Sequence, residues 1–209
     1  MRALLAAVDK SRLAGLQDGV YGIAMTLLVL DVRLPAVPGD VTDAQLWLAV
    51  AGAWPKLLTW LLSFWVLAVF WLDDARALAA CRVIDGTLLR IGLMRLALVS
   101  LLPFSTALIA AHGDHAPAAA IYAGHLLLIA LTRTARHAYL QRHPDATDWP
   151  DPAARLGAAI NAWGTVACML VAFGLAFVVP GYNMLALLPL LLLPAIRRSW
   201  TPPPGLDAS

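Results

Sequence analysis

Charged residues are scarce in this chain. They make up 13% of the 209 residues, whereas hydrophobic residues make up 61%. Ordinary soluble domains carry about 25% charged residues. The net charge of +2 is too small to indicate binding to nucleic acid. The composition therefore predicts an integral membrane protein of one domain, with lipid around it and no nucleic acid among its partners.

The motifs of common enzymes and metal proteins are also missing. Cys81 and Cys168 lie far apart and lack metal-ligand spacing, so we expect free thiols and no disulfide framework. There is no glycine-rich nucleotide loop, no G-x-S-x-G motif and no H-E-x-x-H motif. The T-V-G-Y-G filter of potassium channels is absent as well. We therefore expect no catalytic residue, no cofactor and no resident metal, and we predict that the chain is not an enzyme.

What the sequence does contain is six apolar stretches that are long enough, or nearly so, to cross a bilayer core of about 30 Å as helices. The second is interrupted at Trp54-Pro55-Lys56, where the missing amide donor of proline predicts a kink or a new helix. Because Asp18 and Asp31 bracket the first stretch and no small-x-small pattern follows it, we interpret it as a retained span. The six stretches cover residues 13–33, 46–72, 87–111, 116–139, 155–179 and 182–197.

Arginine and lysine residues lie unevenly between these stretches. Most of them precede the first stretch, follow the sixth, or lie between or near the second and third or the fourth and fifth. The positive-inside rule therefore places both termini in the cytoplasm, which agrees with an even number of spans. We expect a six-helix domain over residues 1–200 and a disordered tail over 201–209. The basic residues on the cytoplasmic side are Arg2, Lys10, Arg12, Arg76, Arg82, Arg90, Arg133, Arg136, Arg142, Arg155, Arg197 and Arg198.

The first stretch has a distinctive stripe. At about 100° per residue, Ile23, Thr26, Leu27 and Leu30 share one face roughly 100° wide, and Asp31 follows Leu27 by one turn. This stripe has two interpretations, a core-facing helix with a solvated end and the lining of a pore. Composition alone favours the core-facing helix.

Ionisable residues within the spans are candidates for function, because charge is costly in lipid. We expect Arg95 to pair with an acid, and His125 to be hydrogen-bonded within the packing. Asp73 and Asp74 lie beside Arg76 at one end of the second span, where an ion-pair network is expected. The alternative functions are a membrane-embedded enzyme using Asp73, Asp74 and His125, and a proton-coupled transporter using Arg95 and His125.

Three ordered blocks of the sequence resemble a known family. The run from Arg12 to Asp31, R-x-x-x-L-Q-D-G followed by an apolar segment with threonine, is similar to the first helix of the transmembrane protein 175 family of potassium channels. Residues 54–72 resemble the second helix, and residues 84–114, with Leu-Leu-Pro-Phe at 101–104, resemble the third. The chain departs from the family at Leu16 and Gln17, where Phe and Ser are usual. It also departs at residues 73 and 74, two aspartates where bacterial members often carry histidines.

The resemblance implies a bacterial potassium channel of the plasma membrane, in which four six-helix subunits surround a pore lined by the first helix, without a re-entrant filter loop. Ile23 matches the hydrophobic constriction, Leu27 and Leu30 match further apolar layers, and Thr26 matches a hydroxyl layer linked with modest preference for potassium. Asp31 would then form a ring of carboxylates at the outer mouth that attracts cations. The motif residues Arg12, Gln17 and Asp18 are expected to be structural, and the partners are lipid, potassium ions and other copies of the chain.

Overall fold

The chain folds into a bundle of long helices. The computed structural model describes residues 9–32, 39–147 and 152–187. Within these ranges all the long elements are α-helices, and short 3-10 helices (η) extend or connect them. The elements are α2 (Lys10–Leu27), η1 (Leu28–Asp31), α3 (Asp43–Gly52), α4 (Trp54–Ala80), α5 (Gly86–His112), α6 (Ala116–Arg142), η2 (Pro144–Ala146), α7 (Pro152–Leu175) and η3 (Asn183–Leu187).

Five of the predicted spans are confirmed as helices long and apolar enough to cross a membrane. The main differences lie at their ends, because an amphipathic helix continues beyond its apolar part. Thus α4 runs to Ala80 rather than to residue 72, and α6 runs to Arg142 rather than to 139. Of the predicted sixth span, only η3 lies in the described part of the chain. Residues 188–197 and the predicted tail lie outside it.

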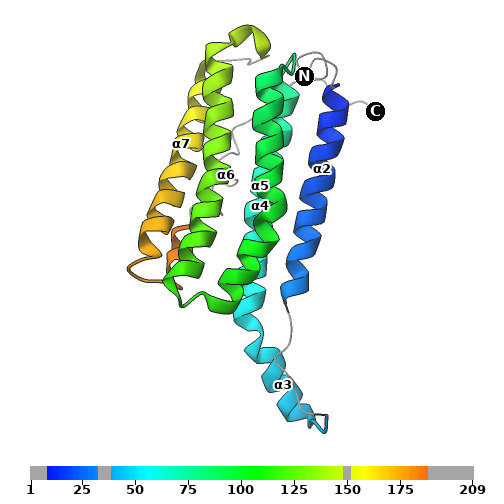
Figure 1. The fold of residues 1–209 in the computed structure, drawn as a ribbon, viewed down its shortest axis with the longest axis vertical. Coiled ribbons are helices and arrows are strands. Elements are labelled where there is room, and N and C mark those ends of the chain that lie inside the picture. Colours follow the sequence, from blue (N-terminus) through cyan, green and yellow to red (C-terminus); the bar gives the residue numbers. More distant parts are fainter. Residues whose placement is uncertain (1–8, 33–38, 148–151, 188–209) are drawn as a thin grey trace.

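The predicted interruption of the second span is confirmed at Ala53. Helix α3 ends at Gly52 and α4 begins at Trp54, with Pro55 in its first turn, where a missing amide donor costs no hydrogen bond. The start of α3 is stabilised by a capping box, in which Thr42 accepts from the Gln45 amide and the Gln45 side chain accepts from the Thr42 amide. Helix α3 has no buried residue and extends from the end of the bundle (Figure 1).

The other helices pack side by side (Figure 1). Helix α6 packs against both α5 and α7, and α2 packs against α4 and α5. The shared core contains Tyr21 of α2, Leu28 of η1, Phe70 of α4 and Leu126 of α6, all at most 1% exposed. Helix α2 therefore lies at the edge of the bundle, with one face against α4 and α5 and the other not covered by the described residues.

The start of α5 is fixed by Asp85. Its carboxylate accepts hydrogen bonds from the amides of Thr87 and Leu88 at 3.0 and 2.8 Å and from the Tyr139 hydroxyl of α6. Partial burial raises the pKa of Asp85, but the Leu88 amide and the Tyr139 hydroxyl outweigh it, so the pKa lies below its usual value. This cap also joins α5 to α6.

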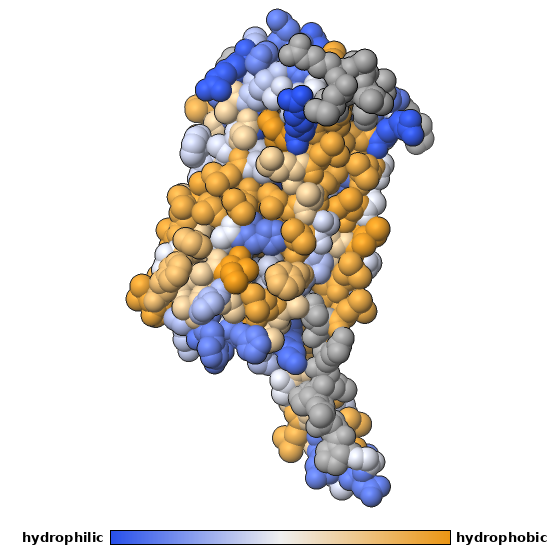
Figure 2. Space-filling view, in the orientation of Figure 1, coloured by the Kyte–Doolittle hydropathy of each residue, from blue (hydrophilic) through white to orange (hydrophobic). Residues whose placement is uncertain are grey.

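The surface of the bundle is divided into zones. Figure 2 shows apolar side chains over the middle of the molecule and hydrophilic residues at both ends of the bundle. Large apolar residues that are exposed include Trp65, Leu101, Phe104 and Val171. A soluble monomer rarely exposes so much contiguous apolar surface, so this belt is the lipid-facing part of a membrane protein.

Candidate functional site

Helix α2 has two different faces. One face is buried in the subunit and carries Leu13, Gln17, Tyr21 and Ala24. The opposite face carries the predicted stripe. There, Ile23 and Leu30 are each 61% exposed and Leu27 is 40% exposed, and Thr26 is exposed as well. The stripe therefore shares one face, as its spacing predicts, and that face is not covered by the rest of the described subunit.

The stripe continues from α2 into η1. Residues of a 3-10 helix repeat every three positions, so Leu30 lies almost directly beyond Leu27 instead of drifting around the helix. The rise is about 6 Å from Ile23 to Leu27 and about 6 Å from Leu27 to Leu30. The apolar layers thus extend over about 12 Å along one line, while Leu28 of η1 points into the core and is fully buried.

The hydroxyl of Thr26 is oriented by its own helix. It donates to the carbonyl of Ile23 at 2.8 Å. Because this bond uses the hydroxyl proton, the oxygen lone pairs remain free to accept or to coordinate. Thr26 therefore presents an exposed hydroxyl oxygen within an otherwise apolar face.

The remaining predicted residues of the first helix have different surroundings. Asp31 ends η1, but its side chain is not among those described. Arg12 is exposed, and Gln17 is 8% exposed, so the larger side chain at this motif position fits inside the subunit. Asp18 accepts a hydrogen bond from the Trp71 indole at 2.7 Å, so the neighbouring helix α4 supplies its partner.

Polar contacts tie α2 to α4 and to the C-terminal end of α4. The Lys10 ammonium donates to the carbonyls of Ala79 and Cys81 at 2.9 and 2.8 Å. The Tyr21 hydroxyl, only two residues before Ile23, donates to the Asp74 carboxylate at 2.6 Å. Together with the bond between Trp71 and Asp18, these contacts fix the rotation of α2 and hence the direction in which Ile23 points.

Asp74 is the centre of a buried ion-pair network. It is 1% exposed and accepts from Tyr21, from Arg95 Nε at 2.6 Å and from Arg136 Nη1 at 2.7 Å. The Arg95 guanidinium also donates to the Ile129 carbonyl at 2.7 Å and lies over the Phe70 ring, 5.2 Å from its centroid. The prediction that Arg95 pairs with an acid is confirmed.

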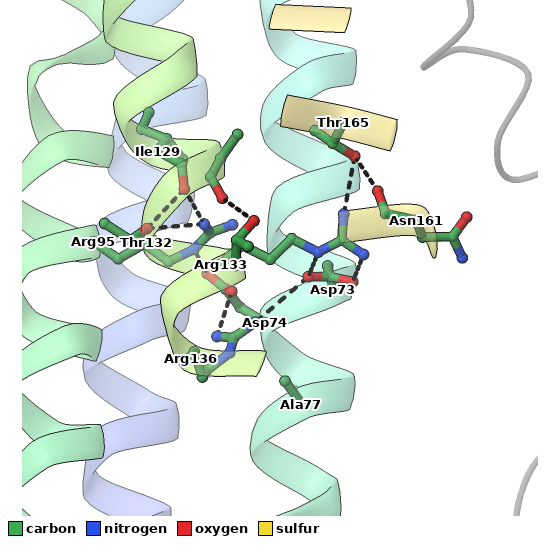
Figure 3. A network of polar contacts seen from close by, with 12 residues as sticks. Asp73, Asp74, Ala77, Arg95, Ile129, Thr132, Arg133, Arg136, Asn161 and Thr165 are labelled. Carbon is green, nitrogen blue, oxygen red and sulfur yellow. Dashed lines mark hydrogen bonds and ion pairs between the residues drawn. The ribbon is translucent and has the colours of Figure 1, made fainter. Parts of the chain in front are cut away.

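Asp73 forms the second half of the network (Figure 3). Its carboxylate binds Arg133 through two guanidinium nitrogens, each at 2.7 Å, and Arg136 at 3.4 Å. Arg133 also donates to the Thr165 hydroxyl of α7 at 3.2 Å. The network therefore connects α2, α4, α5, α6 and α7 in a region where fully paired charges are required.

The sequence predicts an ion-pair network at Asp73 and Asp74 but does not identify their partners on α6. Arg133 and Arg136 fall within the predicted fourth span and are counted among the bases of the cytoplasmic side. Both lie within α6 and bind the aspartates of α4. Tyr21 was missed too. The available signal was its position about 200° around the helix from Ile23, on the core-facing side.

His125 is hydrogen-bonded inside the bundle, as predicted. Its Nε2 donates to the Leu98 carbonyl at 2.9 Å, and its Nδ1 lies 2.8 Å from the Ser105 hydroxyl. The described residues hold no group of three potential metal ligands. Nothing in this arrangement favours the enzyme or the transporter alternative.

Comparison with known proteins identifies the family. A protein-family model described as the endosomal/lysosomal potassium channel TMEM175 matches residues 12–103. A potassium channel of Streptomyces collinus is 31% identical over 176 residues, which cover 81% of this chain and 84% of that protein. The chain belongs to the TMEM175 family of potassium channels. A potassium channel of Chamaesiphon minutus is 33% identical over 126 residues, 59% of this chain and 62% of that protein.

The fold of a solved TMEM175 homologue agrees. The crystal structure of a lysosomal potassium-selective channel TMEM175 homologue from Chamaesiphon minutus matches with a TM-score of 0.76 and 27% identity. The match covers 91% of this chain and 98% of that one. This TMEM175-family chain is therefore a membrane-embedded potassium channel, and the prediction that it is not an enzyme is confirmed by its relatives.

Proposed function

We propose that four copies of this chain surround a central pore lined by α2, and that this pore conducts potassium. The observation that supports the proposal is the division of α2 into two faces. Ile23, Leu27 and Leu30 lie outside the subunit's core, although a core-facing helix was the main alternative. In a closed ring of four, each subunit contacts the next through two different surfaces. Helix α2 can provide one of these surfaces because it lies uncovered at the edge of the described bundle.

Ile23, Leu27 and Leu30 would form the gate. Four branched apolar side chains around one axis leave a neck too narrow to stay wet, and a dry apolar neck stops ions because they must lose their hydration. The neck would be confined to this part of the pore. On the same face, Gly15 and Gly19 are exposed and have open space around them. The pore would therefore widen from Ile23 toward the start of α2. Opening would require α2 to tilt or rotate.

Thr26 would supply the selectivity layer. It lies between the apolar layers, and its exposed oxygen keeps its lone pairs free because the hydroxyl proton is donated to the Ile23 carbonyl. Four such oxygens would replace part of the hydration shell of potassium. A ring of single hydroxyls is less rigid than a cage of backbone carbonyls, so we expect only modest preference for potassium over sodium, without a re-entrant filter loop.

The outer mouth of the pore would lie at the end of η1, and the inner mouth would lie at the start of α2. Asp31 ends η1, beyond the last apolar layer, where four carboxylates would raise the local cation concentration at the outer mouth. We place both termini in the cytoplasm of a bacterial cell, with the subunit in the plasma membrane. A sixth span over 182–197 would complete the domain of residues 1–200, with 201–209 as a tail.

The decisive experiment is potassium flux into liposomes containing the purified protein, together with its oligomeric mass. We expect a tetramer, and we expect Ile23→Asn to increase the flux by wetting the neck. The matched control is Leu101→Asn, because Leu101 is an exposed leucine of α5, 56% exposed, and does not belong to the proposed pore-lining face of α2. If Ile23→Asn leaves the flux unchanged, or if Leu101→Asn raises it equally, α2 does not line the gate.

A further inference from the structure

A proline interrupts the backbone hydrogen bonding of α5. Pro103 lies inside this helix and has no amide hydrogen, so the Val99 carbonyl, four residues before it, lacks its usual helical donor. A helix bends most easily at such a position. The parts of α5 before and after Pro103 are therefore joined less firmly than two parts of an unbroken helix.

His125 of α6 joins these two parts of α5. Its Nε2 donates to the Leu98 carbonyl at 2.9 Å, and its Nδ1 lies 2.8 Å from the Ser105 hydroxyl. Because a carbonyl can only accept, Nε2 carries the proton, and Nδ1 of the neutral ring then accepts from Ser105. Leu98 precedes the proline and Ser105 follows it. One imidazole ring therefore holds both sides of the break, an arrangement that we call the His125 clamp.

The clamp lies at the level of the proposed gate. Tyr21 of α2 and Arg95 of α5 both bind the Asp74 carboxylate, which places these two residues at one level. The two helices start at the same end of the bundle (Figure 1). Seven residues further along each helix, a rise of about 10 Å, come Leu28 and Leu102, both fully buried. The residue immediately before the proline is therefore level with the first residue of η1.

Leu28 connects α5 to the gate. It belongs to η1, which packs against α4 and α5, and it shares one core cluster with Leu102. Leu27 and Leu30, the proposed apolar layers, lie on the opposite, exposed face of the same segment. The part of α5 around the proline therefore supports the gate from behind.

We propose that His125 is a positioning residue for the gate. By clamping α5 across Pro103, it holds this part of α5 against η1 and so keeps Leu27 and Leu30 in the closed ring. Release of the clamp would let α5 bend at the proline, withdraw the support behind η1 and favour the open pore. This inference rests on the proposed function, because it requires that α2 and η1 line the pore.

Potassium flux into liposomes containing the full-length protein tests the clamp. His125→Leu removes both hydrogen bonds. It should raise the flux by roughly two- to ten-fold, the factor that one neutral hydrogen bond contributes to an equilibrium, and should leave the preference for potassium over sodium unchanged. Ser105→Ala removes one of the two bonds and should raise the flux less. An unchanged flux in His125→Leu would overturn the proposal.

A conservative variant separates the hydrogen bonds from the bulk of the ring. The amide of His125→Gln can still donate to the Leu98 carbonyl and accept from the Ser105 hydroxyl, so this variant should keep the wild-type flux. If glutamine raises the flux as much as leucine does, the hydrogen bonds do not position the gate and the proposal is wrong.

A double-mutant cycle tests whether the clamp acts through the proline. Pro103→Ala restores the amide, so α5 regains its bond to the Val99 carbonyl and no longer needs the clamp. On this background, adding His125→Leu should not change the flux further. An equal increase on both backgrounds would show that His125 acts elsewhere, which contradicts the proposal.

Tyr122→Phe is the matched control for general loosening of the bundle. Tyr122 lies one turn before His125 on α6 and is fully buried, and its hydroxyl lies 2.9 Å from the Ser63 hydroxyl of α4. Loss of this hydroxyl should lower the melting temperature but leave the flux at the wild-type value. If Tyr122→Phe raises the flux as much as His125→Leu does, loosening explains the effect and the clamp is refuted.

The outcomes also separate this inference from the proposed function. An increase with Ile23→Asn but none with His125→Leu keeps the pore and removes the clamp. No increase with Ile23→Asn removes both, because α2 then does not line the gate. The oligomeric mass of each variant shows that it has assembled, and if His125→Leu fails to assemble, Ser105→Ala decides the question by the same comparison.

Discussion

Replacement of Asp74 by asparagine is the sharpest test of how α2 is held in the subunit. The substitution keeps the shape of the side chain but removes the charge that binds Tyr21, Arg95 and Arg136. The asparagine amide would also present a donor where the wild-type group accepts three hydrogen bonds. Arg95, which is 1% exposed, would be left without a buried counter-charge.

The expected cost is large. Removing one partner of a buried ion pair destabilises a protein by about 3–5 kcal/mol, against a total stability of about 5–15 kcal/mol. For a chain of this length, each kcal/mol lowers the melting temperature by about 2–4 °C, so Asp74→Asn should lower it by roughly 6–20 °C. Tyr21→Phe removes one hydrogen bond to the same carboxylate and should cost less, about 1.5–3 kcal/mol.

Thermal unfolding in detergent, followed by tryptophan fluorescence, measures both effects. The control is Asp114→Asn, because the side chain of Asp114 is 81% exposed beside His115, and surface ion pairs contribute about 0–1 kcal/mol. Arg95→Met combined with Asp74→Asn should cost less than the two single changes added together, since the unpaired charge is then absent. The control should have a free energy of unfolding within about 1 kcal/mol of the wild-type value. If the free energy of unfolding of Asp74→Asn is equally close to the wild-type value, the reasoning is refuted.

Three further predictions concern the pore and the cap of α5. Thr26→Val should reduce the preference for potassium over sodium, and unaltered reversal potentials in mixed salt would exclude Thr26 from selectivity. Asp31→Asn should lower potassium flux more at low ionic strength than at high, since screening acts over about 10 Å at 0.1 M; a loss independent of salt would argue against a carboxylate ring. Asp85→Ala should lower stability by about 1 kcal/mol at neutral pH. Because hydrogen bonds lower the pKa of Asp85 in the folded state, this contribution is complete above its usual pKa of about 3.9 and is lost as the pH falls through the folded value. The wild-type and Asp85→Ala unfolding curves should therefore converge in acid, and a constant difference down to pH 2 would contradict the cap.

The sequence by itself determined the helical membrane architecture and the family. Long apolar stretches predict membrane-crossing helices because the backbone must bond internally in lipid, and Pro55 marked the break between α3 and α4 through a local effect on the backbone. The stripe of α2 followed from helical spacing alone. The motif from Arg12 to Asp31 carried the resemblance to the channel family, which the comparisons confirmed.

Only the tertiary structure decided which charges meet and which face of α2 is buried. Asp73 and Asp74 bind arginines about 60 residues further along the chain, and no local pattern encodes such a pairing. Hydropathy also cannot separate apolar residues that face the core from those that face lipid or a pore, because both environments favour the same side chains. The packing of α2 against α4 and α5 resolved this ambiguity within the subunit by burying Tyr21 and leaving Ile23 uncovered.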